Sequence, residues 1–169
     1  QDGSKENFLP TKNFKITVDP AVVIATKTLP PARQDQIVPT IEWTYNKSYV
    51  TKTELAMIDI LSHNNWKRPI YFAITVPNDN YMGLGDYLYN EGFAYRLLPL
   101  KKAIQDTTQE KLELTNTDVM YNNMMTKFKW GNMKHATYLD PESVRMSFTI
   151  INHFNILAEN LYRGYITDI

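Results

Sequence analysis

The sequence has no cysteine, no excess of either charge and no long apolar segment. Without cysteine, the chain cannot form a disulfide framework or a thiolate metal site. Lysine and arginine together number 18, as do aspartate and glutamate, and this balance argues against a general nucleic-acid binder, which needs a basic surface. No apolar run approaches the roughly 18 residues of a membrane-spanning helix. A hydrophobic content of 43% and a charged content of 21% indicate a globular fold.

Recognisable cofactor and catalytic motifs are missing as well. Gly83 and Gly85 lack the third glycine of a dinucleotide fingerprint, and no phosphate loop is present. His63, His135 and His153 belong to no recognisable metal-ligand motif. No nucleophile-elbow pattern is found either. We therefore expect no cofactor, no metal and no catalytic residue in this chain.

The most informative stretch is the apolar run between Pro69 and Pro77. It is rich in β-branched and aromatic residues, which is typical of a strand that is buried on both faces. Strands of this kind lie mostly in parallel sheets that are covered by helices on each side. We therefore expect residues 71–74 to lie in the middle of such a sheet.

The neighbouring segments support a parallel sheet. Residues 14–18 and 41–45 alternate apolar and polar side chains, and residues 93–98 form another short apolar segment. Helices are expected after the capping-box pattern at Thr51 and after Gly83. The resulting order of strands and helices predicts an α/β fold: a mostly parallel sheet with helices on both faces in three layers, followed by a helical C-terminal part.

Two further helix starts are marked by an aspartate followed by a proline, at Asp19 and at Asp140. After Asp140, apolar residues recur at helical spacing as far as Gly164 and predict a long amphipathic helix. The expected apolar stripe comprises Val144, Phe148, Ile151, Phe154, Ala158 and Leu161.

The chain length is that of one domain. We expect a single domain over residues 1–169, with an α/β unit over residues 14–99 and a helical part over residues 115–164.

Candidate ligand-binding residues follow from the predicted sheet, because ligands of α/β folds bind beyond the carboxyl ends of strands. The loop of residues 78–86 would lie there, although its Asn and Asp side chains also suit a plain turn. Trp66 and Arg68 could stack on a sugar or a partner, although a turn tryptophan more often packs under a sheet. The candidates are Trp66, Arg68, Asn78, Asp79, Asn80, Tyr81 and Asp86.

Three segments together resemble a known family: residues 64–73, 91–99 and 125–131. They read Asn-Asn-Trp-Lys-Arg-Pro-Ile-Tyr-Phe-Ala, Glu-Gly-Phe-Ala-Tyr-Arg-Leu-Leu-Pro and Met-Thr-Lys-Phe-Lys-Trp-Gly. The chain resembles the soluble C-terminal region of a bacterial family of multi-pass membrane proteins of unknown function, described as protein O-mannosyltransferase-like glycosyltransferases. The resemblance covers most of the chain, from about Phe8 to about Gly164.

This resemblance implies a piece of a larger membrane protein, located on the extracytoplasmic, periplasmic side of a bacterial membrane. In such glycosyltransferases the catalytic acid lies in the membrane-spanning part, so no catalytic residue can be assigned here. The implied partners are the spanning part of the same polypeptide and a glycan or an acceptor protein, and no nucleic acid. The implied function is that of a non-catalytic domain that assists the transferase or presents its acceptor.

Two alternatives remain open. One is a carbohydrate- or peptide-binding module, in which the candidate residues line a shallow site that combines apolar stacking with a few polar groups. The other is a stand-alone α/β enzyme with an unrecognised site. Sugar transfer by the isolated chain would favour the enzyme, whereas binding without transfer would favour the module.

Overall fold

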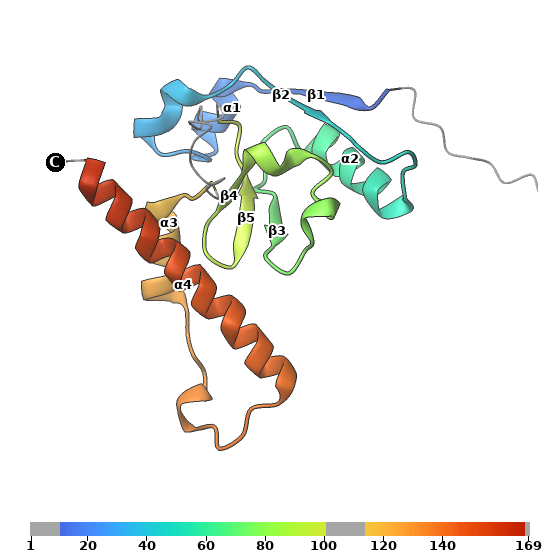
Figure 1. Cartoon of the computed structure of the whole chain (residues 1–169). Helices are drawn as coiled ribbons and strands as arrows, with labels where there is room; N and C mark the ends of the chain where they lie inside the picture. The colour runs from blue at the N-terminus through green and yellow to red at the C-terminus, as the bar shows by residue number, and fades with distance from the viewer. Residues whose placement is uncertain (1–10, 101–113, 168–169) are drawn as a thin grey trace, which may run out of the picture. The chain divides into compact units, whose positions relative to one another are not determined.

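The computed structural model of the chain describes residues 11–100 and 114–167 (Figure 1). The chain divides into two compact units. The first comprises Gln1–Leu88 and Arg96–Lys111, and the second comprises Tyr89–Tyr95 and Leu112–Ile169. The expected single domain over residues 1–169, with its parts at 14–99 and 115–164, stays a prediction.

In the first unit, β1 (Asn13–Thr17) and β2 (Thr40–Thr44) form a two-stranded antiparallel sheet. Phe14 lies opposite Trp43, and the two rings stack with their centres 5.4 Å apart. Ile41 and Trp43 are buried. The alternating patterns that predicted these two strands are confirmed, because apolar side chains of one face are covered while the polar side chains between them stay exposed.

Two short helices connect β1 to β2, namely α1 (Pro20–Ala25) and the 3₁₀ helix η1 (Pro31–Gln36). Asp19 caps α1, because its Oδ1 accepts a hydrogen bond of 2.9 Å from the backbone N–H of Ala21. The helix start that was predicted from the aspartate and proline is therefore confirmed.

The helix α2 (Lys52–Asn64) begins with the predicted capping box. The backbone N–H of Glu54 donates to Thr51 Oγ1 at 3.2 Å, and the backbone N–H of Thr51 donates to Glu54 Oε2 at 2.8 Å. These reciprocal bonds satisfy donors that the first turn of a helix otherwise leaves unpaired. The capping prediction is confirmed.

The second sheet contradicts the predicted fold class. It consists of β3 (Tyr71–Ala73), β4 (Leu88–Asn90) and β5 (Ala94–Leu97), in the order β3-β5-β4, and it is antiparallel. The residues that the structure describes contain no parallel sheet, so the three-layer α/β prediction is wrong. The strand β2 pairs with β1 and not with β3, so the predicted strand-helix-strand unit does not form.

The segment that follows β3 also differs from the prediction. Between β3 and β4 the chain forms only two short 3₁₀ helices, η2 (Asn78–Asn80) and η3 (Leu84–Tyr87). The helix that was expected after Gly83 is therefore a single 3₁₀ turn, too short to cover the face of a sheet as the crossover of a parallel unit does.

The central position predicted for residues 71–74 is wrong too, because β3 lies at an edge of its sheet and ends at Ala73. Tyr71 is 48% exposed, whereas Phe72 is only 8% exposed. Tyr71, Ala73 and Thr75 all face solvent between more buried neighbours. The run is therefore an alternating, half-buried segment whose outward residues happen to be apolar or small, and this composition made it look buried on both faces.

The second unit is mainly helical. It contains α3 (Thr117–Asn122), a π-helical turn η4 (Asn123–Lys127), the 3₁₀ helix η5 (Met133–His135) and α4 (Pro141–Thr167). Asp140 caps α4, since its Oδ1 accepts from the backbone N–H groups of Glu142 at 3.0 Å and Ser143 at 3.1 Å. The predicted start of the long helix is therefore confirmed.

The face by which α4 packs differs from the predicted stripe. The core of the second unit comprises Met120, Met124 and Leu157, and His153 is also buried. Apolar residues lie on more than one side of α4, so their spacing does not select the buried side. The prediction is wrong for five stripe residues, which are exposed: Val144, Phe148, Ile151, Ala158 and Leu161.

Candidate functional site

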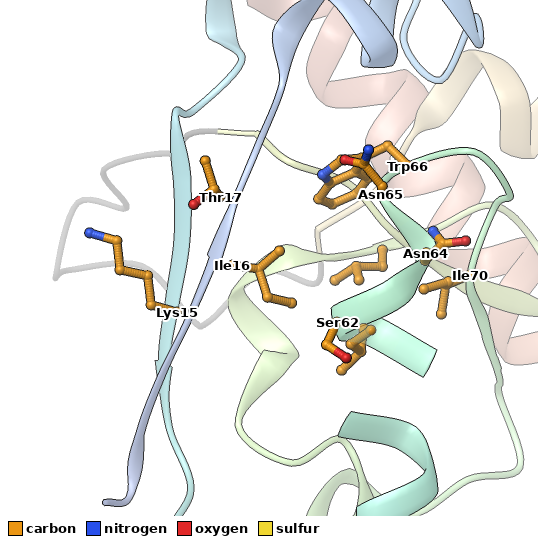
Figure 2. A pocket seen from close by; sticks show the side chains of 10 residues that line it. Lys15, Ile16, Thr17, Ser62, Asn64, Asn65, Trp66 and Ile70 are labelled. Atoms are coloured by element: carbon orange, nitrogen blue, oxygen red, sulfur yellow. The ribbon is translucent and has the colours of Figure 1, made fainter. Parts of the chain in front are cut away.

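A cavity of about 310 Å³ lies in the first unit between β1 and the end of α2 (Figure 2). Leu61, Trp66 and Leu97 are buried and give the cavity its apolar character. In Figure 2, the side chain of Ile16 points from β1 towards the end of α2. The complete lining comprises Lys15, Ile16, Thr17, Leu61, Ser62, Asn64, Asn65, Trp66, Ile70 and Leu97.

An unusual turn brings Trp66 to the cavity. Asn65 and Trp66 both have left-handed backbone angles, with φ of 43° and 57°. Asn64 holds the turn, because its side-chain Nδ2 donates to the Arg68 carbonyl at 2.8 Å and its own carbonyl accepts from the Lys67 N–H at 3.0 Å. Asparagine tolerates the left-handed backbone conformation, but for tryptophan this conformation costs on the order of 1–3 kcal/mol. Burial of the indole, which is only 8% exposed, offsets that strain.

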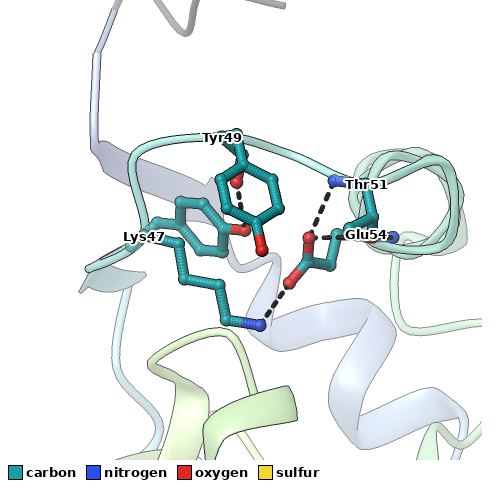
Figure 3. A network of polar contacts seen from close by, with 5 residues as sticks. Lys47, Tyr49, Thr51 and Glu54 are labelled. Carbon is teal, nitrogen blue, oxygen red and sulfur yellow. Dashed lines mark hydrogen bonds and ion pairs between the residues drawn. The ribbon is translucent and has the colours of Figure 1, made fainter.

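A second polar arrangement lies in the loop between β2 and α2, around the buried carboxylate of Glu54 (Figure 3). Lys47 Nζ lies 2.8 Å from Glu54 Oε1. The backbone N–H and the hydroxyl of Thr51 each lie 2.8 Å from Glu54 Oε2. The hydroxyl of Tyr45 donates to the Tyr49 carbonyl at 2.8 Å. These bonds connect the loop to the first turn of α2.

The electrostatics of this loop favour an ionised Glu54. Burial is the largest influence and raises the pKa of Glu54, but interactions with Lys47, Thr51 and Tyr45 lower its pKa to about 2. Burial, and then the interaction with Glu54, raise the pKa of Tyr45 to about 12. A carboxylate that is ionised and hydrogen-bonded at neutral pH is a poor proton donor. The arrangement around Glu54 therefore serves to hold the loop in place.

Of the seven residues predicted as ligand-binding, only Trp66 belongs to the lining of the cavity beside β1. Arg68 follows Trp66 closely in sequence, but it is exposed and does not belong to the lining. Tyr81 is buried and packs edge-on against Phe72, with ring centres 5.6 Å apart. The remaining four, Asn78, Asp79, Asn80 and Asp86, belong to η2 and η3 and are absent from the lining.

Sequence reasoning missed most of the cavity. Lys15, Ile16 and Thr17 were seen only as part of an alternating strand, and Leu97 only as part of another. Their proximity to α2 depends on contacts between segments that are far apart in the chain. Asn64 and Asn65 gave a local signal that could have been used, because two asparagines at a helix end favour a left-handed turn.

The second unit has its own buried polar cluster at the turn between β4 and β5. Glu91 is 4% exposed, and its Oε1 accepts a hydrogen bond of 2.9 Å from Asn116 Nδ2. The Glu91 carbonyl accepts from Asn123 Nδ2 at 2.8 Å, and the side chain of Asn90 accepts from the Gly92 N–H, also at 2.8 Å. These bonds tie the turn to α3 and η4, so the cluster has a structural role.

Two further properties concern the part of the chain that the structure describes. No group of three or more acidic or histidine side chains there is placed to hold a metal ion. None of the helices there combines the length and the hydropathy that crossing a membrane requires.

Comparison with known proteins gives one match. Residues 1–121, well over half of the 169 residues, match the family described as TMEM260-associated domain 2. No curated protein and no solved structure matches the chain. TMEM260 is a membrane protein of an O-mannosyltransferase-like family, so the resemblance to such proteins is confirmed at this level. The chain belongs to the TMEM260-associated domain 2 family.

Proposed function

We propose that this domain is a non-catalytic, extracytoplasmic part of a membrane glycosyltransferase of the protein O-mannosyltransferase-like class. In this proposal it binds the acceptor and presents it to the membrane-spanning part. Membership of a family associated with a membrane protein supports the proposal. The observation that carries it is the cavity beside β1 and α2, whose residues all lie within the stretch that matches the family.

The chemistry of the cavity suits binding better than proton transfer. Buried apolar side chains and a few amide and hydroxyl groups are typical of a ligand pocket. Lys15 is the charged residue of the lining, and no carboxylate or histidine belongs to that set of ten residues. General acid and base catalysis uses such groups within hydrogen-bonding reach of the substrate. The cavity can thus hold an acceptor while the reaction takes place elsewhere.

A sugar-transfer assay with a lipid-linked donor tests the proposal on the full-length protein and on the 169-residue chain. We expect transfer by the full-length protein and none by the chain alone. In the full-length protein, Ile16→Trp should fill the cavity and raise the KM for the acceptor at least tenfold, with kcat nearly unchanged. Thr53→Trp is the matched control, because it adds the same ring to an exposed position in the first turn of α2, outside the cavity lining.

Three results would contradict the proposal. Transfer by the isolated chain would show that it is itself catalytic. An unchanged acceptor KM in the Ile16→Trp protein would show that the cavity does not handle the acceptor. An equal rise of KM in the Thr53→Trp protein would show that the effect is not specific to the cavity.

A second candidate function is a binding module for carbohydrate or peptide. The amide and hydroxyl groups of Ser62, Asn64 and Asn65 around an apolar cavity favour it. A glycan array followed by calorimetry would identify a sugar ligand. Binding that Asp79→Ala removes but Ile16→Trp retains would locate the ligand at η2, whereas the reverse result would locate it in the cavity.

A further inference from the structure

The two outer edges of the β1–β2 sheet differ in how their backbone groups are satisfied. Lys12 and Tyr45 are hydrogen-bonded across the sheet at 2.7 Å, and Val18 and Pro39 at 2.9 Å. Hydrogen-bonded pairs alternate with unbonded ones in an antiparallel sheet. In the observed register, Phe14 and Ile16 therefore point their backbone groups towards β2. Asn13, Lys15 and Thr17 point theirs away from it.

The outer edge of β2 is covered at its centre. The hydroxyl of Tyr87 accepts from the Glu42 backbone N–H at 3.3 Å and donates to the Glu42 carbonyl at the same distance. At the outer edge of β1, the N–H of Asn13 donates to the hydroxyl of its neighbour Thr11 at 3.1 Å. Within the described part of the chain, the backbone groups of Lys15 and Thr17 have no such partner.

The cavity adjoins this unpaired part of β1. Its lining includes three consecutive residues of β1, numbers 15–17, and none of β2. In Figure 2 the ribbons of β1 and β2 cross, and the Ile16 side chain lies on the side of β1 that faces the end of α2. An exposed strand edge beside an apolar pocket is the arrangement by which domains bind an extended peptide as an added strand. Backbone bonds then provide affinity, and the pocket selects one side chain of the peptide.

The charges near the cavity favour an acidic peptide. The lining contains Lys15 and no acidic side chain. Lys67 and Arg68, which follow Trp66, are exposed and make no ion pair with other described residues. The nearby acids are already engaged, since Glu42 lies 3.2 Å from Lys15 and Asp59 lies 3.2 Å from His63. Lys15 is paired with Glu42, so an incoming negative charge meets Lys67 and Arg68, which have no ion-pair partner among the described residues.

We infer that the outer edge of β1 at Lys15 and Thr17 binds an extended acidic peptide segment as a third strand, with one apolar side chain in the cavity. The inference rests on the proposed function and deepens it, because the bound peptide would be part of the acceptor. A cavity of about 310 Å³ is at the lower end of ligand pockets, which suits a single side chain. Trp66 is only 8% exposed and presents little ring surface for stacking on a sugar.

The test uses a library of capped heptapeptides with aspartate at both ends and a randomised interior. Peptides are selected on the immobilised 169-residue chain, and those that also bind the Ile16→Trp chain are removed. Hydrogen exchange of the ¹⁵N-labelled chain then reports which backbone groups the selected peptide pairs with. In the free chain, the amides of Lys15 and Thr17 should exchange fast while those of Phe14 and Ile16 are protected.

With a selected peptide, we expect protection of the Lys15 and Thr17 amides to rise at least tenfold. N-methylation of alternate peptide bonds in the paired register should abolish that protection. Lys67→Glu should weaken binding at least tenfold, and a peptide with lysine at both ends should recover it. Lys129→Glu, an exposed lysine of the second unit, is the matched control and should have no effect.

Several results would overturn the inference. One is that no peptide of the library is selected. Another is a peptide that shifts the resonances of Trp66 without protecting Lys15 and Thr17, which would show binding in the cavity without strand addition. Equal weakening by Lys129→Glu would show that overall charge, not this edge, attracts the peptide. None of these results affects the transfer assay on the full-length protein, which decides the proposed function separately.

Discussion

The two units of the chain are built in different ways. The first pairs β1 with β2 and caps α2 with a buried carboxylate, and most of its large apolar residues are covered. The second packs a small core of Met120, Met124 and Leu157, while its long helix leaves Phe148 68% exposed and Ile151 52% exposed. The first unit therefore combines a paired sheet, a capped helix and covered apolar side chains. The second unit buries only one face of its long helix.

The family match separates the two units in a similar way. Residues 1–121 include the whole of the first unit, but the second unit only as far as Tyr121, within α3. The helix α4 lies outside the match. The residues that match the family therefore include the complete cavity and the edge of β1. This difference places the functional hypotheses in the first unit.

The largest effect is expected at Gly83 of the first unit. Its φ is +87°, and a Cβ at this position would lie 2.3 Å from the Thr44 carbonyl oxygen. Backbone atoms cannot yield as a side chain can, so Gly83→Ala should destabilise the first unit by about 4 kcal/mol or more. Urea denaturation followed by NMR signals of the first unit would measure the loss.

Two other glycines sharpen this prediction. Gly85→Ala should have little effect, because a Cβ there meets nothing within 4 Å. Gly92 of the second unit has a φ of +119°, but its Cβ would meet a movable side-chain atom, Met124 Cγ, at 3.2 Å. Gly92→Ala should therefore cost less than Gly83→Ala, about 2 kcal/mol. An equal loss at Gly83 and Gly85 would contradict the proposed contact with Thr44.

The next effect separates the two sides of α4. Leu157 is 3% exposed and belongs to the core of the second unit, so Leu157→Ala should cost about 3 kcal/mol. Phe148→Ala, on the exposed side, should change stability by less than about 0.5 kcal/mol. Thermal or urea unfolding of both variants measures the difference. A larger loss for Phe148→Ala would restore the apolar stripe that was predicted from the sequence.

Acid should weaken the first unit through Glu54. Its pKa in the folded chain is lowered from 4.5 to about 2, so its contribution is complete above pH 4.5 and is lost as the pH falls towards 2. The shift corresponds to roughly 3 kcal/mol. We expect the free energy of unfolding to fall by about this much between pH 4.5 and pH 2. Any change caused by other titrating groups adds to this loss.

The Glu54→Gln chain isolates this contribution, because it should be less stable at pH 7 and should depend less steeply on acid. Glu142→Gln is the matched control. Glu142 pairs with Arg145 on the exposed surface of α4, where solvent screens the charges, so this change should leave the acid dependence nearly unaltered. Parallel acid curves of the wild-type chain and the Glu54→Gln chain would show that Glu54 is not the group responsible.

The smallest effect is expected at the start of α4. Asp140 accepts two backbone hydrogen bonds, and the interaction with Ser143 lowers the pKa of its carboxyl group. Asp140→Ala should cost about 1 kcal/mol, and Asp140→Asn should retain most of that stability, because asparagine is also a good cap. Hydrogen exchange in the first turn of α4 would show the loss. Equal losses for both variants would indicate that charge, and not capping, matters here.

Helix starts were the most predictable feature of this fold. Asp19, Thr51 and Asp140 were all identified from their neighbours, and each accepts the hydrogen bonds expected of a cap. Capping depends on residues within one turn of the helix, so the information lies in a few adjacent positions. The candidate site was predictable only at Trp66, because the remaining lining comes from four separate segments of the chain.

The sequence by itself determined the caps, the alternation of β1 and β2, and the resemblance that the family match supports at the level of TMEM260. Only the tertiary structure decided that β2 pairs with β1, that β3 is an edge strand and that α4 buries the side of Leu157. Caps and alternation are local, whereas strand partners and the choice between two apolar helix faces depend on which distant segment packs against them. The unpaired edge of β1 beside the cavity belongs to this second kind, since it exists only because no other strand in the described part of the chain occupies it.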